Sequence, residues 1–206
     1  MARRGEALRE HILDTAKLAF LEGGFAGTSM DAIAARAQTS KRSLYAHFET
    51  KDALLVAVVH RMRDLFEERI RTPADYAEDP AEAVTMFCAR VLQLVRWSNV
   101  ARTLRIGIAE AGRLPELSVG IHDALFGAAE QHLREYLHDR CGRAEGEAAI
   151  MTTRIVGLVL HPALPRVLFG IDPLREELGE LDSREIGDVR ALAGPAIAEA
   201  TGADPR

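Results

Sequence analysis

The chain lacks the features that indicate several common classes of protein. No apolar run approaches the roughly 20 residues that span a bilayer, and the basic N-terminus lacks the apolar stretch of a signal peptide. Seven Phe, three Tyr and one Trp, with few alternating β-branched residues, argue against a β-sheet protein. The cysteines, Cys88 and Cys141, are too few for a disulfide framework. We therefore expect a cytoplasmic chain with reduced thiols and no membrane partner.

Lysine is scarce as well, and its distribution is uneven. Lys17, Lys41 and Lys51 are the only three, and residues 1–51 hold eight basic and six acidic side chains, a net charge of +2. The remainder carries −7, which gives the overall −5. A mildly basic N-terminal part would face phosphate while the acidic body points away. The difference is modest and decides nothing alone.

Sequence signatures of catalysis are also missing. The chain has no glycine-rich phosphate loop, no His-Glu-x-x-His and no nucleophile elbow. His122-Asp123 and His161 lack the spacing of metal ligands. We expect no enzymatic activity, no cofactor and no metal site, although an all-helical enzyme that joins residues distant in sequence stays open as an alternative.

Apolar residues at helical spacing occur along the whole chain and predict an all-α fold of about nine helices. A three-helix, helix-turn-helix head (residues 1–53) would precede a helical body (residues 54–206), to which only a family resemblance assigns ligand binding and dimerisation. Thr28 with Asp31 reads as a capping box for the second helix. The first expected helix ends at Gly23-Gly24. The others cover residues 28–36, 40–48, 50–70, 80–98, 100–111, 115–141, 145–159 and 183–200, and Pro162 and Pro165 break the chain of helices after residue 159.

The third predicted helix has one apolar and one polar side. On a helical wheel Leu44 and Phe48 point toward the first helix, whereas Arg42 and Ala46 point away. Arg42 can donate two hydrogen bonds to guanine, and Ala46 can meet a thymine methyl. Ser43 and Tyr45 flank this side, and Thr28, Ser29, Lys41, His47 and Lys51 are placed for phosphates. Tyr45 could instead be a packed aromatic, His47 a helix-end residue and Lys51 a solvated charge.

Two segments carry a specific resemblance. TSMDAIA at residues 28–34 and SKRSLYAHFETKDAL at residues 40–54 resemble the N-terminal signature of TetR/AcrR-family transcriptional regulators, over about residues 8–60. In the body, LRIGIAEA at residues 104–111 with Pro115–Leu117 resembles the AefR-like class of C-terminal domains.

The resemblance implies a homodimer built by the last two helices and a ligand cavity among helices five to eight. It also implies that Lys41, Arg42, Ser43, Tyr45 and His47 meet DNA and that Lys51 meets phosphate. Two positions depart from the family pattern. Gln38 stands where the turn often has glycine, so a positive φ there would cost about 1 kcal/mol. The Pro162/Pro165 pair interrupts a helix of the expected interface.

Residues of the body could line the pocket or belong to the core. Those proposed for a ligand are apolar or polar side chains on the body helices: Met86, Phe87, Arg90, Trp97, Ile106, Glu110, His122, Phe126, Met151 and Arg154. Buried charges among them must pair or meet a polar ligand.

The sequence thus predicts a dimeric regulator that binds double-stranded operator DNA and a small-molecule effector whose identity it does not reveal. A repressor released by its ligand is the leading hypothesis. An activator or a ligand-independent DNA-binding protein is the alternative.

Overall fold

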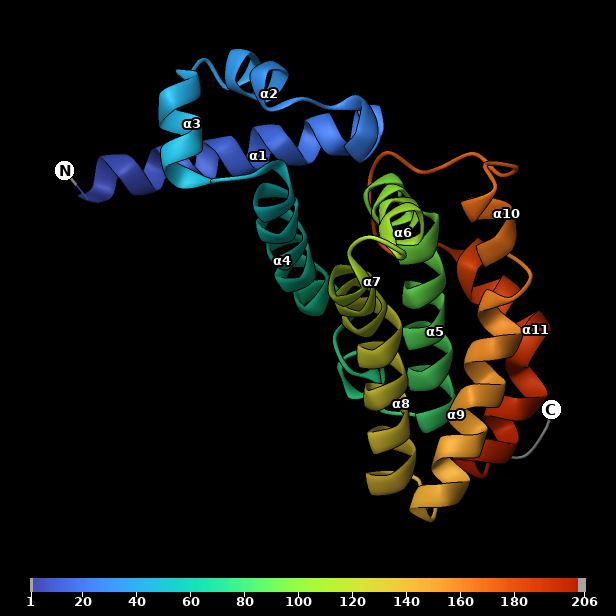
Figure 1. Cartoon of the computed structure of the whole chain (residues 1–206). Helices are drawn as coiled ribbons and strands as arrows, with labels where there is room; N and C mark the ends of the chain where they lie inside the picture. The colour runs from blue at the N-terminus through green and yellow to red at the C-terminus, as the bar shows by residue number, and fades with distance from the viewer. Residues whose placement is uncertain (1, 204–206) are drawn as a thin grey trace. The chain divides into compact units, whose positions relative to one another are not determined.

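The computed structural model describes residues 2–203, with side chains from residue 5 onward except that of residue 67. The described part is helical, and its only β-type pairing is an isolated bridge between Trp97 and Arg175. The all-α prediction is therefore confirmed (Figure 1). The chain forms two compact units.

The first unit comprises the chain up to Leu65 together with Arg105–Ile121. It holds α1 (Ala2–Gly27), α2 (Met30–Arg36), α3 (Lys41–His47), most of α4 (Lys51–Ile70), the second half of α6 (Ser98–Glu110) and most of α7 (Pro115–His122). The predicted boundary at residue 53 stays a prediction, but the compact unit extends further because a distant segment packs on it.

Local signals start and stop the helices of this unit. Gly24 has φ +70°, outside the helical region, and interrupts α1 where the glycine pair predicted an end. Thr50 caps α4 by accepting a hydrogen bond from the amide of Ala53, at 3.0 Å, as predicted. The predicted capping box is wrong by one residue: Ser29, not Thr28, is the N-cap of α2, and its hydroxyl accepts from the amide of Ala32.

The second unit comprises Phe66–Leu104 and His122–Arg206, described to residue 203. After η1 (Pro73–Asp75), α5 (Pro80–Arg96) packs against α11 (Ser183–Thr201), which in turn packs on α9 (Glu145–Leu160). The helix α8 (Ala128–Asp139) lies against α9 (Figure 1). The buried core of α5 and α11 includes Phe87, Leu92, Leu94, Val189, Ala193 and Ile197.

Two predicted helices of the body are interrupted. Pro162 and Pro165 separate α9 from the short α10 (Leu164–Leu168), as predicted, because proline lacks the N–H that a helix interior needs. The single helix expected over residues 115–141 is wrong: a π turn, η2 (Asp123–Gly127), lies between α7 and α8. Such a turn inserts a residue into the helical repeat, and apolar spacing does not reveal it.

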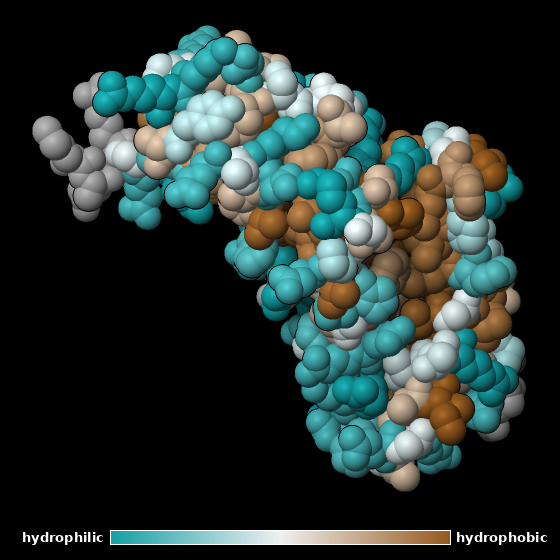
Figure 2. All heavy atoms as spheres, viewed as in Figure 1, coloured by the Kyte–Doolittle hydropathy of each residue, from teal (hydrophilic) through white to brown (hydrophobic). Residues whose placement is uncertain are grey.

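Apolar side chains reach the surface of the second unit. Figure 2 shows them gathered over α5, between α8 and α9. On α9, Ile150 is 73 % exposed and Leu158 is 40 % exposed, and Leu192 on α11 is partly exposed too. Contiguous apolar area of this kind marks an interaction surface more often than a free one.

Candidate nucleic-acid interface

The helix predicted to contact DNA is α3 (Lys41–His47), and its side chains divide into a buried and an exposed face. Ser40 caps it by accepting a 3.0 Å hydrogen bond from the amide of Ser43. Leu44 is completely buried and Phe48 nearly so, whereas Arg42, Tyr45 and Ala46 are exposed, Tyr45 by 47 %. The helix contains no acidic residue. The geometry therefore leaves a short basic and aromatic face free to meet a ligand.

The charged residues of this face differ in their partners. Lys41 pairs with Asp31 of α2, with 2.5 Å between the ammonium nitrogen and a carboxylate oxygen. Within the described residues, Arg42 has no hydrogen-bond or ion-pair partner, so its guanidinium is available. His47 is half-buried, with its ring 6.5 Å from that of Phe48.

The turn between α2 and α3 is a tight helix stop. Gln38 has φ +50°, and its amide donates to the carbonyl of Ala35 at 3.1 Å. The amide of Thr39 donates to the carbonyl of Ala34 at 3.0 Å, which completes a Schellman motif. The nitrogen Nε2 of His11 lies 3.2 Å from the carbonyl of Ala37 and joins this turn to α1. The left-handed conformation expected at Gln38 is present.

Two predicted phosphate contacts at the start of α2 lie in different environments. Ser29 is exposed, with its hydroxyl engaged in the cap. Thr28 is 7 % exposed, and its hydroxyl donates to the carbonyl of Gly24 at 2.8 Å and lies 3.1 Å from that of Ala19. The side chain of Thr28 thus joins the end of α1 to α2, and its amide donates to the carbonyl of Phe25 at 3.3 Å, so its phosphate contact stays a prediction.

Lys51 holds the first unit together from the start of α4. Its ammonium donates 2.8 Å hydrogen bonds to the carbonyls of Phe25 and Thr28 and lies 4.1 Å from the centre of the Phe25 ring. The predicted phosphate contact of Lys51 stays a prediction, but a structural role for this lysine is visible.

Arg113 joins the segment after α6 to the start of α4, a contact that sequence reasoning missed. It lies after α6, donates to Asp52 at 2.7 Å and to Glu110 at 2.8 Å, and its guanidinium carbon lies 4.6 Å from the centre of the Phe25 ring. The hydrogen bonds to Asp52 and then Glu110 raise the pKa of Arg113. Asp52 is 61 residues away in sequence, so no local pattern could have paired the two.

The predicted ligand residues do not form one group. Phe87 is completely buried, Trp97 donates its indole N–H to the carbonyl of Glu176, and Arg154 pairs with Glu199. Exposed His122 packs beside half-buried Phe126. Ile106 and Glu110 belong to the first unit, Met151 is half-buried on α9, and Met86 and Arg90 line a shared pocket.

That pocket is an open cavity of about 720 Å³ in the second unit. Its walls come from the end of α4 and the segment after it, from α5, and from the loop before α11. The lining residues are Glu68, Arg69, Arg71, Asp75, Tyr76, Met86, Arg90, Leu178, Gly179, Glu180 and Leu181. Across residues 2–203, no cluster of three His, Cys, Asp or Glu side chains is arranged to hold a metal ion.

Comparison with known proteins agrees with the geometry of the head. Residues 12–58 match the family model of bacterial regulatory proteins, tetR family. An uncharacterized HTH-type transcriptional regulator of Mycobacterium tuberculosis is 38 % identical over 96 residues, 46 % of this chain and 47 % of the relative. The HTH-type transcriptional repressor DhaR of a Mycobacterium species is 33 % identical over 72 residues, 35 % of each chain. The chain therefore spans half or less of the length of these relatives.

Solved structures match over nearly the whole length. The flavonoid-responsive regulator FrrA has a TM-score of 0.71 at 22 % identity, with 95 % of this chain and 97 % of that chain covered. AibR, solved with isovaleryl coenzyme A and operator DNA, has a TM-score of 0.58 at 25 % identity, with 90 % and 97 % covered. Residues 12–58 therefore match the tetR family of bacterial regulatory proteins, and the described chain shares the all-helical fold of these solved regulators.

Proposed function

We propose that the protein is a ligand-responsive transcriptional regulator that binds double-stranded operator DNA as a homodimer, most simply as a repressor. The observation that carries the proposal is the exposed face of α3, where Arg42 and Tyr45 lie free while Leu44 anchors the helix in the core. A basic helix that follows a tight turn and carries no carboxylate fits the major groove.

The names of similar proteins support the regulatory part of the proposal. DhaR is named a transcriptional repressor, FrrA a flavonoid-responsive regulator, and AibR was solved with both an acyl coenzyme A and operator DNA. The proposed activity contains no catalytic step. No helix within residues 2–203 is long and apolar enough to cross a membrane, and we place the protein in the cytoplasm with its DNA.

Dimerisation would supply the second recognition helix. The exposed apolar side chains Ile150 and Leu158 on α9 and Leu192 on α11 offer a self-complementary surface. A Cβ added at Gly157 or Gly194 would meet nothing within 4 Å, so a partner helix could approach closely at both positions. Two copies paired here would read half-sites about 34–36 Å apart, or a multiple of that distance, on one side of the duplex.

Selection from a pool of random DNA duplexes tests the proposal. We expect the full-length protein to retain a two-fold symmetric motif, with an affinity that falls steeply as salt rises. Arg42→Ala should cost about 1–3 kcal/mol and relax the preference at one base pair of each half-site. Arg134→Ala, which removes an exposed charge from α8, is the matched control and should change neither.

A reporter gene then distinguishes a repressor from an activator. With the selected motif placed over its promoter, a repressor lowers expression and an activator raises it. Retention of no DNA above background at low salt would refute DNA binding itself.

A further inference from the structure

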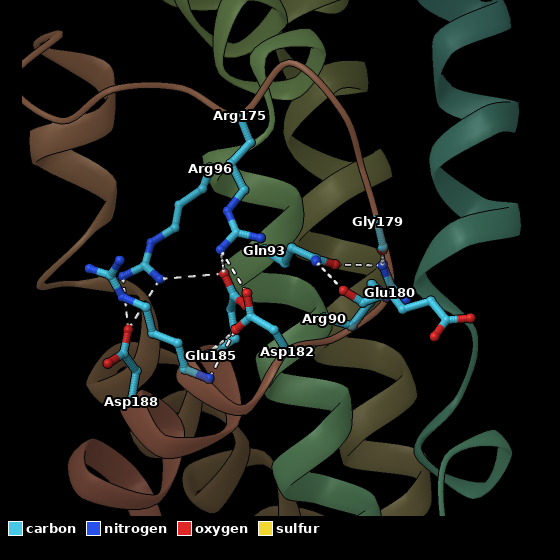
Figure 3. Close-up of polar contacts among 10 residues, drawn as sticks. Arg90, Gln93, Arg96, Arg175, Gly179, Glu180, Asp182, Glu185 and Asp188 are labelled. Atoms are coloured by element: carbon cyan, nitrogen blue, oxygen red, sulfur yellow. Dashed lines mark hydrogen bonds and ion pairs between the residues drawn. The ribbon is translucent and has the colours of Figure 1, made fainter.

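The cavity lies between the end of α4, α5 and the loop before α11. Hydrogen bonds from α5 fix the loop that forms one of its walls. On α5, Arg90 donates to the carbonyl of Gly179 at 3.0 Å, and the amide nitrogen of Gln93 donates to the carbonyl of Glu180 at 2.9 Å (Figure 3). Further along the same loop, Arg175 lies 2.5 Å from the fully buried carboxylate of Glu185. The loop is therefore held in place by side chains of α5 and α11.

Three arginines of this cavity form no ion pair, like Arg134, Arg140 and Arg184 elsewhere in the described part of the unit. Within the described side chains no carboxylate lies within 4.0 Å of Arg69, Arg71 or Arg90. By contrast, ion pairs of 4.0 Å or less engage Arg96, Arg102, Arg143, Arg154, Arg166, Arg175 and Arg190 of the same unit. The cavity thus holds three guanidinium groups that share its lining with the carboxylates of Glu68, Asp75 and Glu180 but form no ion pair with them.

Arg90 is the least exposed of these three arginines. It is half-buried, and the hydrogen bonds given for it go to the neutral oxygens of Gln93, at 2.5 Å, and Gly179. Figure 3 shows the carboxylate of Glu180 pointing away from Arg90. A partly desolvated guanidinium bound to neutral acceptors is stabilised when an anion arrives, because a charge removed from water gains most from a charged partner.

The other walls indicate the shape of that anion. Met86, Leu178 and Leu181 offer apolar surface. The phenol of Tyr76 donates to the carbonyl of Ile70 at 2.8 Å and keeps its oxygen as an acceptor for a ligand N–H or O–H. Glu68 and Glu180 on the lining disfavour a multiply charged ion.

We propose that this cavity binds the effector and that the effector is a small organic monocarboxylate, with its carboxylate on Arg90 and Arg71 and its apolar part on Met86 and the loop. The regulatory part of this inference rests on the proposed function. Glu68 and Arg69 belong to α4, the same continuous helix that begins at Lys51 directly after the recognition helix. Arg71, at φ +54°, is the strained residue where that helix stops, so a ligand held there acts on its end.

Calorimetry on the full chain tests the site without DNA. The probes are benzoate and hexanoate, each compared with its neutral amide, and inorganic phosphate. We expect one of the two carboxylates to bind at least tenfold more tightly than its amide and than phosphate. Arg90→Met and Arg71→Met should each weaken that binding about tenfold or more, whereas Arg134→Met on α8 should not.

Arg71→Met serves as the second variant because no hydrogen bond of its side chain is part of the loop wall, so it separates ligand binding from misfolding. Equal affinity for carboxylate and amide, unchanged affinity in Arg90→Met and Arg71→Met, or binding of neither carboxylate would each overturn the proposal.

Gel shifts on the selected DNA distinguish this failure from failure of the proposed function. If the protein binds DNA but neither carboxylate, the proposed function stands and the carboxylate site is refuted. If it binds a carboxylate through Arg90 but retains no DNA, the carboxylate site stands and the proposed function is refuted. If the carboxylate binds without weakening the DNA complex, its role as effector is refuted.

Discussion

Gln38 offers the sharpest test of how the sequence shapes the DNA-binding head, because its strain is purely local. Its φ of +50° lies in the left-handed region, where an L residue other than glycine pays about 1–2 kcal/mol. Both hydrogen bonds of the turn use backbone atoms, from the amides of Gln38 and Thr39, and survive any side chain. Gln38→Gly should therefore relieve the strain and keep the turn.

Part of the gain is lost because glycine makes the unfolded chain more flexible, by about 0.5–1 kcal/mol. We expect a net stabilisation of about 0.5–1 kcal/mol and, for cooperative unfolding of a chain of this length, a rise in Tm of about 1–4 °C. Thermal unfolding followed by circular dichroism gives the shift. Hydrogen exchange of the peptide covering residues 28–48 shows whether the gain lies in the head.

Two further substitutions test whether the backbone conformation causes the effect. Gln38→Val should lower Tm, since a β-branched side chain tolerates positive φ least. Gly24 has φ +70° and ψ 169°, a region that only glycine adopts readily, with open space around a built Cβ, so Gly24→Ala should cost about 1–3 kcal/mol for backbone reasons alone. A Gln38→Gly protein that melts at or below the wild-type temperature, beside a destabilised Gly24→Ala, would refute the reasoning and show that the side chain of Gln38 stabilises the turn.

Three further predictions concern other parts of the molecule. Lys51→Met should destabilise the head by about 1–3 kcal/mol in urea unfolding, because the carbonyls of Phe25 and Thr28 lose a charged donor; an unchanged midpoint would assign Lys51 to phosphate alone. Leu158→Glu should leave the helical content unchanged and shift the protein to monomers in sedimentation, with the DNA affinity falling accordingly; a persistent dimer would contradict the α9 interface. Burial raises the pKa of the Cys88 thiol to about 12, so between pH 9 and 12 the unfolded chain loses this proton and the folded one keeps it. The free energy of unfolding should fall over that range more steeply in the wild type than in Cys88→Ala, and equal slopes would contradict the shift.

Much of the head could be predicted because its signals are local. The spacing of Leu44 and Phe48 fixed which face of α3 is buried, and that choice left Arg42 and Tyr45 outside. The end of α1 near Gly24 likewise follows from the backbone freedom of the residue itself. The separation of α9 from α10 follows from the missing N–H of proline in the same local way.

The errors arose where two local solutions were equivalent. Thr28 and Ser29 can both cap a helix, and tertiary packing decided between them by drawing the Thr28 hydroxyl onto the carbonyls of α1. The π turn at Asp123–Gly127 was missed because one inserted residue leaves the apolar pattern on either side intact.

The sequence by itself determined most of the helices, the caps at Ser40 and Thr50 and the exposed basic face of α3, because each depends on residues within a turn or two of one another. Only the tertiary structure decided that Arg113 meets Asp52 and that Arg90 meets the carbonyl of Gly179, 89 residues away. A pocket is formed by chain segments whose separation in sequence carries no periodic signal. Its lining follows from packing, and packing becomes visible only once the helices have been placed against one another.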